Sequence, residues 1–185
     1  VVVRNSKITG NSAARITIAG AASICITFEN CLIANNIATT SGGWYSCGLF
    51  GGNFSGSQPG RHFSLNFVNS VVRDNANLGG ESALFWLYAC GTSSCLRAYG
   101  TLFEGNYAKS GAALVSSGGF RLGFDSCTFK DNGLSPDGTT TNSTLFSVAD
   151  REDDAMIRNC TFVGNWGKGT AHQKYGLIDV TSAHP

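Results

Sequence analysis

The sequence predicts an all-β protein: a single-stranded, right-handed parallel β-helix of about five to six coils, each made of about three short strands. Three observations lead to this prediction: a seven-residue motif recurs along the chain, large residues alternate with other residues before it, and glycine and β-branched residues are abundant. We expect residues 1–185 to form a single domain, either a segment of a longer solenoid or a unit stacked with other subunits.

The recurring motif ends in asparagine. A small residue, a variable residue and a large apolar residue are followed three positions later by Asn, as in 126–132 (SCTFKDN) and 159–165 (NCTFVGN). The terminal asparagines are Asn11, Asn36, Asn75, Asn106, Asn132 and Asn165, and successive ones lie 25, 39, 31, 26 and 33 residues apart. A repeat of this length with variable spacing is typical of a solenoid, in which each copy forms one supersecondary unit.

Three strands are expected in each repeat. Ahead of several motifs, large residues occupy every second position, as Phe120, Leu122 and Phe124 do before Cys127, and a period of two predicts a strand with one buried face. The small residue of the motif lies three positions after the last of these large residues, and this odd offset predicts a bend. The motif then forms the second strand. A third strand is expected after the following loop, in the segments 48–50, 83–85, 113–115, 144–146 and 176–178.

The six asparagines are expected to stack at one corner as an asparagine ladder with a structural role. Asn tolerates the left-handed backbone of a sharp bend, and its amide bonds to nearby backbone groups. A catalytic or metal-binding row is the alternative interpretation.

A second row of residues predicts an assembly surface. If the last large residue of each third-strand segment points inward, its neighbour points outward, and the neighbours form an exposed apolar stripe. The candidates are Leu49, Leu84, Trp86, Leu114, Leu145 and Leu177. The alternative is that a loop covers the stripe, or that the strand bends and buries both rows.

Cysteines and sequons indicate a secreted protein at the cell surface or outside the cell. The chain has 7 cysteines, and N-x-Ser/Thr sequons make Asn53, Asn142 and Asn159 candidates for glycosylation. Reduced cysteines in a cytosolic core are the alternative.

Four cysteines are candidates for disulfides. Cys127 and Cys160 occupy the same inward position in adjacent repeats, where both a disulfide and a row of free thiols remain open. Cys90 and Cys95 flank a short loop and could close it.

Composition excludes several functions. A formal net charge of +1, with 14% charged residues, argues against binding nucleic acid through a basic patch. No apolar run reaches about 18 residues, so no membrane-spanning helix is expected. No Cys-x-x-Cys pair occurs and the 3 histidines lie far apart, so neither a metal nor another cofactor is expected.

A carbohydrate-active enzyme is an alternative function, because many parallel β-helices are polysaccharide lyases or hydrolases. Glycosidic hydrolysis uses two carboxylates on one face, and the densest acidic group, 150–154, contains Asp153 and Asp154. No second acidic row accompanies it, so we interpret it as a solvated corner and expect no catalytic site. A glycan-binding module using Trp44, Tyr45 and Trp166 is a further alternative.

The motif and its companion strand resemble the repeats of the polymorphic outer-membrane protein family of chlamydiae. The Phe-x-x-Asn motif of that family is matched at 103–106, 129–132 and 162–165, while the other copies carry Ile or Val in place of Phe. Its Gly-Gly-Ala-Ile/Leu/Val motif is approximated at 79–84 (GGESAL) and 110–114 (SGAAL). The resemblance implies a surface-displayed adhesive or structural β-helix and supplies no catalytic residues.

These features together predict a non-enzymatic extracellular structural protein. It would be a β-helical building block of a cell-surface assembly or filament, or an adhesive stalk. The expected partners are further copies of the chain or other surface proteins, with glycans as another class.

Overall fold

The computed structural model of the chain describes residues 1–12, 16–18, 23–39, 49–53, 63–79, 83–88, 94–109, 111–118, 121–137, 139, 144–150, 155–167 and 178–182. All regular structure in these ranges is β-strand, and the strands form parallel sheets with their residues in register. This arrangement confirms the all-β class and is consistent with a parallel β-helix or solenoid.

Each repeat of the chain contributes one strand to each of three large sheets. Sheet A contains β1 (Val2–Arg4), β4 (Ile24–Glu29), β8 (Phe63–Val68), β12 (Cys95–Tyr99), β16 (Arg121–Asp125) and β19 (Ala155–Arg158). Sheet B contains β2 (Lys7–Thr9), β5 (Leu32–Ala34), β9 (Val71–Arg73), β13 (Leu102–Glu104), β17 (Thr128–Lys130) and β20 (Thr161–Val163). Sheet D contains β3 (Ile16–Ile18), β7 (Phe50–Asn53), β11 (Phe85–Tyr88), β15 (Ala112–Gly118), β18 (Thr144–Asp150) and β21 (Ile178–Ser182).

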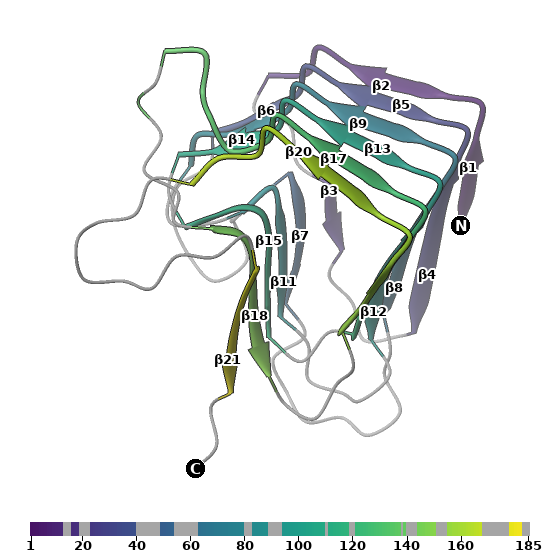
Figure 1. The fold of residues 1–185 in the computed structure, drawn as a ribbon. Helices are drawn as coiled ribbons and strands as arrows, with labels where there is room; N and C mark the ends of the chain where they lie inside the picture. Colours follow the sequence, from purple (N-terminus) through teal and green to yellow (C-terminus); the bar gives the residue numbers. More distant parts are fainter. Residues whose placement is uncertain are drawn as a thin grey trace.

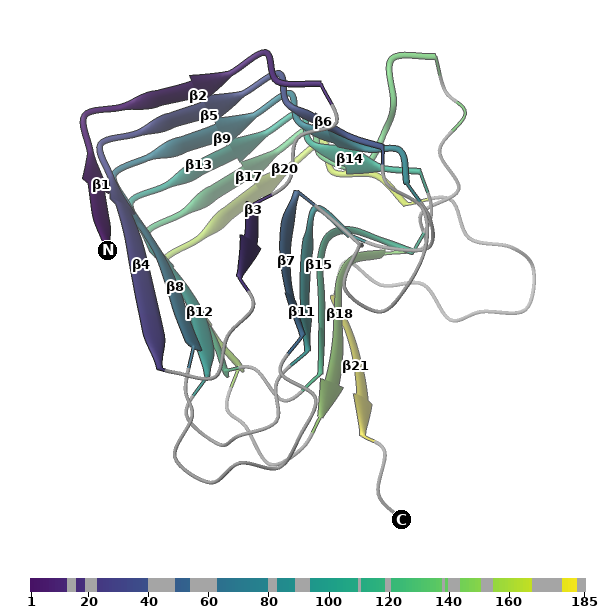
Figure 2. The same ribbon diagram turned by 180° about the vertical axis from the view of Figure 1, so that it is seen from behind.

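A short fourth sheet was not expected from the sequence. Sheet C consists of β6 (Ile37–Ala38), β10 (Ala76–Asn77) and β14 (Tyr107–Ala108), directly after the ladder asparagines. Sheets A and B meet at a corner, sheet D runs along the other side of the molecule, and sheet C lies between sheets B and D (Figures 1 and 2). Sheet D contains strands at the expected third positions, but they lie further along the chain than predicted: β7, β11 and β21 begin only at the last residue of the predicted segments, and all five extend beyond them.

Stacked phenylalanines fill the interior between these sheets. On sheet B the ring of Phe129 stacks on Phe103 and Phe162, with centroid separations of 5.0 and 4.8 Å. On sheet D the rings of Phe50 and Phe85 stack at 4.9 Å. Most rings from different sheets meet edge to face, whereas Phe124 of sheet A stacks on Phe146 of sheet D at 5.4 Å. Each buried ring removes enough apolar surface from water to stabilise the fold by about 1.5–3 kcal/mol.

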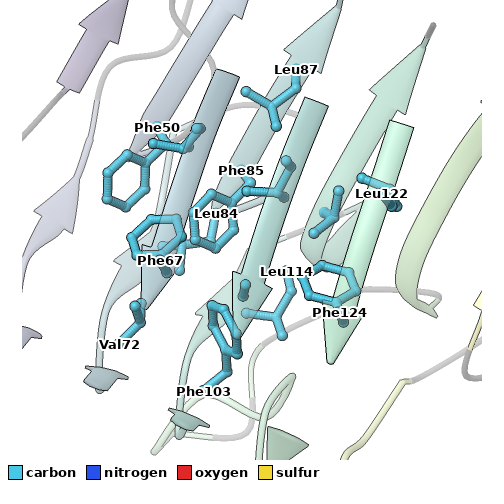
Figure 3. Close-up of a cluster of buried hydrophobic side chains, with 14 of the residues drawn as sticks. Phe50, Phe67, Val72, Leu84, Phe85, Leu87, Phe103, Leu114, Leu122 and Phe124 are labelled. Atoms are coloured by element: carbon cyan, nitrogen blue, oxygen red, sulfur yellow. The ribbon is translucent and has the colours of Figure 1, made fainter. Parts of the chain in front are cut away.

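The prediction of an exposed leucine stripe is wrong. Leu49, Leu84, Leu114 and Leu145 are at most 2% exposed and belong to the same core as the phenylalanines that follow them in the chain. Figure 3 shows Leu84 and Leu114 among the buried phenylalanines. The alternation fails because the backbone bends there: Leu49 and Leu84 precede β7 and β11 in bends, and the register of β15 against β18 shifts after Ala112. Trp86 is half-buried, and Leu177 lies outside the described residues.

Two rows of left-handed residues turn the chain at the ends of the sheet B strands. One row precedes the small residue of each motif and comprises Asn5, Asn30, Asn69, Gly100, Ser126 and Asn159. The other precedes each ladder asparagine and comprises Gly10, Asn35, Asp74, Gly105, Asp131 and Gly164. The left-handed backbone that we assigned to the ladder asparagines therefore belongs to the residue before each of them.

Candidate functional site

The asparagine ladder predicted from the sequence is present. Each asparagine from Asn11 to Asn132 donates from Nδ2 to Oδ1 of the asparagine in the next repeat, over 2.8–3.0 Å. The backbone N–H of the same residue donates to the same oxygen, over 3.0–3.2 Å. From Asn36 onward, Nδ2 also donates to a backbone carbonyl of the preceding repeat. The amides of the inner asparagines are thus saturated with structural bonds, which leaves them no means of binding a ligand.

The ladder has a direction. The backbone N–H and one Nδ2 hydrogen of each asparagine point towards the next repeat, whereas Oδ1 accepts from the preceding repeat. The two ends of the ladder therefore differ. Among the described residues, nothing donates to Oδ1 of Asn11, and the backbone N–H of Asn165 has no acceptor. Within the described part of the chain, the two ends therefore present complementary groups without partners.

The small residue of each motif also has a structural role. Its hydroxyl or thiol donates to the backbone carbonyl two residues earlier, where sheet A turns into sheet B. The residues are Ser6, Cys31, Ser70, Thr101, Cys127 and Cys160. Serine, threonine and cysteine can replace one another in this row because all three are small side chains that can donate a hydrogen bond.

The cysteines of the described residues are free thiols. The Cys127–Cys160 disulfide that the sequence left open is not formed, and burial raises the pKa of the Cys127 thiol to about 11. Cys95 is also a free thiol, and its Sγ lies 3.1 Å from Oγ of Ser64. Cys90 lies outside the described residues.

The glycosylation candidates stay predictions. Asn159 is exposed at the corner between β19 and β20, and its Nδ2 donates to Asp125 over 3.3 Å. Asn53 lies in β7 with its side chain undescribed, and Asn142 falls outside the described residues.

The described ranges supply no metal-binding cluster. They hold no group of three or more histidine, cysteine, aspartate or glutamate side chains placed to bind a metal ion. Asp153, Asp154, Trp44 and Tyr45 lie outside them, while Trp166 is half-buried and its backbone N–H donates to Asn132. The described part of the chain also contains no helix that could cross a membrane.

The most distinctive surface feature is a trough on the outer face of sheet A. One row of outward-facing residues crosses neighbouring strands in register: Thr27, Asn66, Arg97, Gly123 and Met156. Together with Val68, Tyr99 and Asp125 of the adjacent row, they line a cavity of about 380 Å³. The trough therefore runs across the strands. Because neighbouring strands in a sheet lie about 4.8 Å apart, successive residues of the row follow one another at this spacing.

Gly123 lies in the floor of the trough, beneath the side chain of Arg97. It lies in β16 without a left-handed backbone, so the conformation does not require glycine there. A Cβ atom at this position would lie 3.3 Å from Cγ of Arg97, closer than most such contacts in proteins. The stem of Arg97 therefore lies close over Gly123, where a larger residue would have to displace it.

The charges beside the trough differ in whether they are paired. Nη2 of Arg158 lies 2.7 Å from Oδ2 of Asp125, and its hydrogen bond keeps the pKa of that carboxyl below its ordinary value. Arg97 is exposed, and no described residue forms a hydrogen bond or ion pair with its guanidinium. Tyr99 and Met156 are 54% and 47% exposed. The trough thus combines exposed apolar groups with a cation that has no partner among the described residues.

Sequence reasoning missed this site, although β12 carries a signal. Arg97 and Tyr99 alternate with the buried Leu96 and Ala98, so both can be placed on the outer face from the sequence. Their proximity to Gly123 depends on the register between β12 and β16, which the alternation within one strand does not define.

Comparisons of the chain with protein-family models, with curated proteins and with solved structures found no match.

Proposed function

We propose that this chain is a non-enzymatic extracellular structural protein, a building block of a cell-surface assembly or filament or of an adhesive stalk. In this proposal the sheets form a right-handed parallel β-helix of about five to six coils, and the stiff rod works by stacking with further copies of itself.

The observation that carries the proposal is the direction of the asparagine ladder. Oδ1 of Asn11 lacks a donor and the N–H of Asn165 lacks an acceptor among the described residues. If a second copy is placed head to tail, the N–H of Asn165 can donate to Oδ1 of Asn11 in that copy, as the N–H of Asn106 donates to Oδ1 of Asn132 within the chain. A heterologous contact of this kind does not close on itself unless a rotation completes a ring, so it extends into a filament.

The apolar residues at both ends support the same contact. Ile8 at one end, and Ile157 and Phe162 at the other, are only partly buried against the core. Their counterparts in the inner repeats, such as Ile33 and Phe129, are completely buried. Covering the end residues with another repeat would add apolar burial worth about 25 cal/mol per Å².

The strand edges are compatible with such stacking. Among the described strands, β1 and β2 at one end, and β19 and β20 at the other, pair on one side only. Unpaired strand edges readily accept another strand, and addition at both ends would continue the parallel sheets. The sequons and the resemblance to polymorphic outer-membrane repeats support an extracellular location for this assembly.

The test is electron microscopy of the undenatured protein together with its mass in solution over a range of concentrations. We expect rods, and a mass that rises with concentration in multiples of the chain. Ile8→Lys places a charge in the end contact, whereas Thr9→Lys places the same charge on the outer face of the same strand. Ile8→Lys should abolish the rods and Thr9→Lys should retain them.

Circular dichroism must show that both variants retain the β structure. A wild-type chain that stays monomeric at every concentration, or rods that survive Ile8→Lys, would contradict the proposal.

A further inference from the structure

We propose that the trough on the outer face of sheet A binds an acidic oligosaccharide, a chain of sugars that carry carboxylate or sulfate groups, with Arg97 as its main anchor. This inference goes beyond the stacking function. The trough lies on the side of the sheets, so a ligand there leaves the strand edges at both ends uncovered.

The shape of the trough suits a linear ligand. Its floor is formed by outward-facing residues of neighbouring strands, which are in register across the sheet from Asn66 through Arg97 and Gly123 to Met156. A chain lying across the strands would meet a new side chain about every 4.8 Å. Gly123 lies in this floor without a side chain, and a Cβ there would lie 3.3 Å from Cγ of Arg97.

The exposed apolar groups suit the faces of sugar rings. Tyr99 presents a half-exposed aromatic ring beside the trough, and its hydroxyl has no hydrogen-bond partner among the described residues. A tyrosine in such a position offers an apolar face for packing and a polar group at its tip. Met156 adds a polarizable, adaptable surface on the opposite side of Gly123.

The charges favour an acidic ligand over a neutral one. Arg97, Arg121 and Arg158 all lie on the outer face of β12, β16 and β19, and Asp125 is the acidic residue among them. The carboxylate of Asp125 is already bound by Arg158, so its charge is compensated. Arg97 remains as a cation without a partner in the described part of the chain, and a planar guanidinium is well suited to carboxylate and sulfate groups.

The same observations disfavour a nucleic acid. The chain has a formal net charge of +1, so it offers no extended basic surface for a phosphate backbone. The lining of the trough is also mainly apolar, with a single unpaired cation, which fits a sugar chain with spaced acidic groups better than a continuous polyanion.

Two substitutions test the site in different ways. Arg97→Gln removes the unpaired charge from an exposed position, and Gly123→Leu fills the trough without requiring a left-handed backbone. Arg73→Gln is the matched control, because it removes an exposed arginine from sheet B. Circular dichroism and thermal unfolding establish that each variant folds; if Gly123→Leu does not, Arg97→Gln carries the test.

Binding is measured by isothermal titration calorimetry with defined probes. The acidic probes are a galacturonate hexasaccharide and a chondroitin sulfate hexasaccharide; the comparison probes are cellohexaose and a single-stranded DNA hexamer. We expect at least one acidic saccharide to bind, with affinity that falls as salt is added. Arg97→Gln and Gly123→Leu should each weaken that binding by about tenfold or more, and Arg73→Gln should leave it unchanged.

Three results would overturn the inference. Neither acidic saccharide binds the wild-type chain; or cellohexaose or the DNA hexamer binds at least as tightly as the acidic saccharides; or Arg97→Gln binds as tightly as the wild type. Rod formation in these variants is scored separately, so loss of saccharide binding with intact rods concerns the trough alone.

Discussion

Asn106 donates two hydrogen bonds to one oxygen atom: its backbone N–H and its Nδ2 reach Oδ1 of Asn132 over 3.1 and 3.0 Å. Both residues are completely buried, although 26 residues separate them in the chain. A single side chain thus replaces the solvent for two donors of the neighbouring repeat, and the same relationship recurs along the ladder. The structure explains why the motif ends in asparagine: the pattern needs an acceptor and donors on one short side chain.

The inner ladder should be critical for stability. In Asn106→Ala, the N–H and Nδ2 of Asn75 lose their acceptor, and the carbonyl of Val72 loses a donor. Leaving these buried groups unsatisfied should lower the free energy of unfolding by about 3–5 kcal/mol in urea titrations. Asn11→Ala, at the exposed end, should cost about 1 kcal/mol or less. Equal losses in both variants would show that the ladder does not stabilise the fold in this way.

The glycine at a left-handed corner is expected to matter most where the neighbouring repeat lies close. Gly105 has a φ of 62°, and a Cβ there would lie 2.6 Å from Oδ1 of Asp74. Gly10 has a similar φ of 69°, with nothing within 4 Å of such a Cβ. Gly10→Ala should therefore cost about 1 kcal/mol of backbone strain, and Gly105→Ala about 2 kcal/mol, because the exposed carboxylate of Asp74 must also rotate away. Urea unfolding measures both, and similar costs would contradict the role of the contact.

The phenylalanine stack should show a difference between the inside and the end of the molecule. Phe129 is completely buried between Phe103 and Phe162. Phe129→Ala should therefore cost about 3–5 kcal/mol in the free energy of unfolding. Phe162→Ala should cost about 1–2 kcal/mol at low protein concentration, because that ring is partly exposed. If the ends stack, the Phe162→Ala cost should increase with protein concentration; a cost that does not change would argue against burial of Phe162 in an assembly.

The buried thiol of Cys127 should be unreactive in the folded protein. With a pKa of about 11, only about one thiol in a thousand is ionised at pH 8, and the thiolate is the reactive form. We expect a thiol reagent at this pH to label the exposed Cys25 and to spare Cys127, as read by mass spectrometry of peptides. After denaturation both should be labelled. Labelling of Cys127 as fast as Cys25 before unfolding would contradict its burial.

The turn that contains Asp137 should contribute to acid stability. Hydrogen bonds from Ser135 and Thr139 lower the pKa of the Asp137 carboxyl from 3.8 to about 2. Because the pKa is lower in the folded state, the ionised carboxyl stabilises the fold, and this stabilisation is complete at pH values above the pKa of the unfolded chain. That contribution disappears as the pH falls through about 4 to about 2.

An NMR titration of the Asp137 carboxyl checks this assignment. The midpoint should lie near 2, and Ser135→Ala, which removes the largest cause of the shift, should raise it towards the ordinary value. A midpoint near 3.8 in the wild-type chain would show that the turn does not hold the ionised carboxyl.

Local pattern made much of the architecture predictable. The motif marks the strands of sheet B, and the alternation before it marks those of sheet A, since each position repeats the same local requirement in every repeat. The asparagine ladder was predictable for the same reason. Asparagine occupies the same position in every copy of the motif, from Asn11 to Asn165, so stacking of the repeats aligns these residues.

The same reasoning failed where the backbone leaves the regular strand. Leu84 and Phe85 are adjacent in sequence, so a straight strand would place them on opposite faces, yet both are buried. A bend before β11 turns both side chains inward, and the short sheet C beside it has only two residues in each strand. Elements of that length carry too few residues to show a period.

The sequence by itself determined the all-β class, the positions of the main strands and the row of asparagines that links the repeats. These features rest on side-chain requirements that recur at each repeat and can be read from one segment at a time. Only the tertiary structure decided that the leucines are buried and that Arg97, Tyr99 and Gly123 share a trough. The physical reason is that burial depends on how the backbone bends. The trough, in turn, depends on the register between strands 26 or more residues apart, which contacts between whole repeats establish.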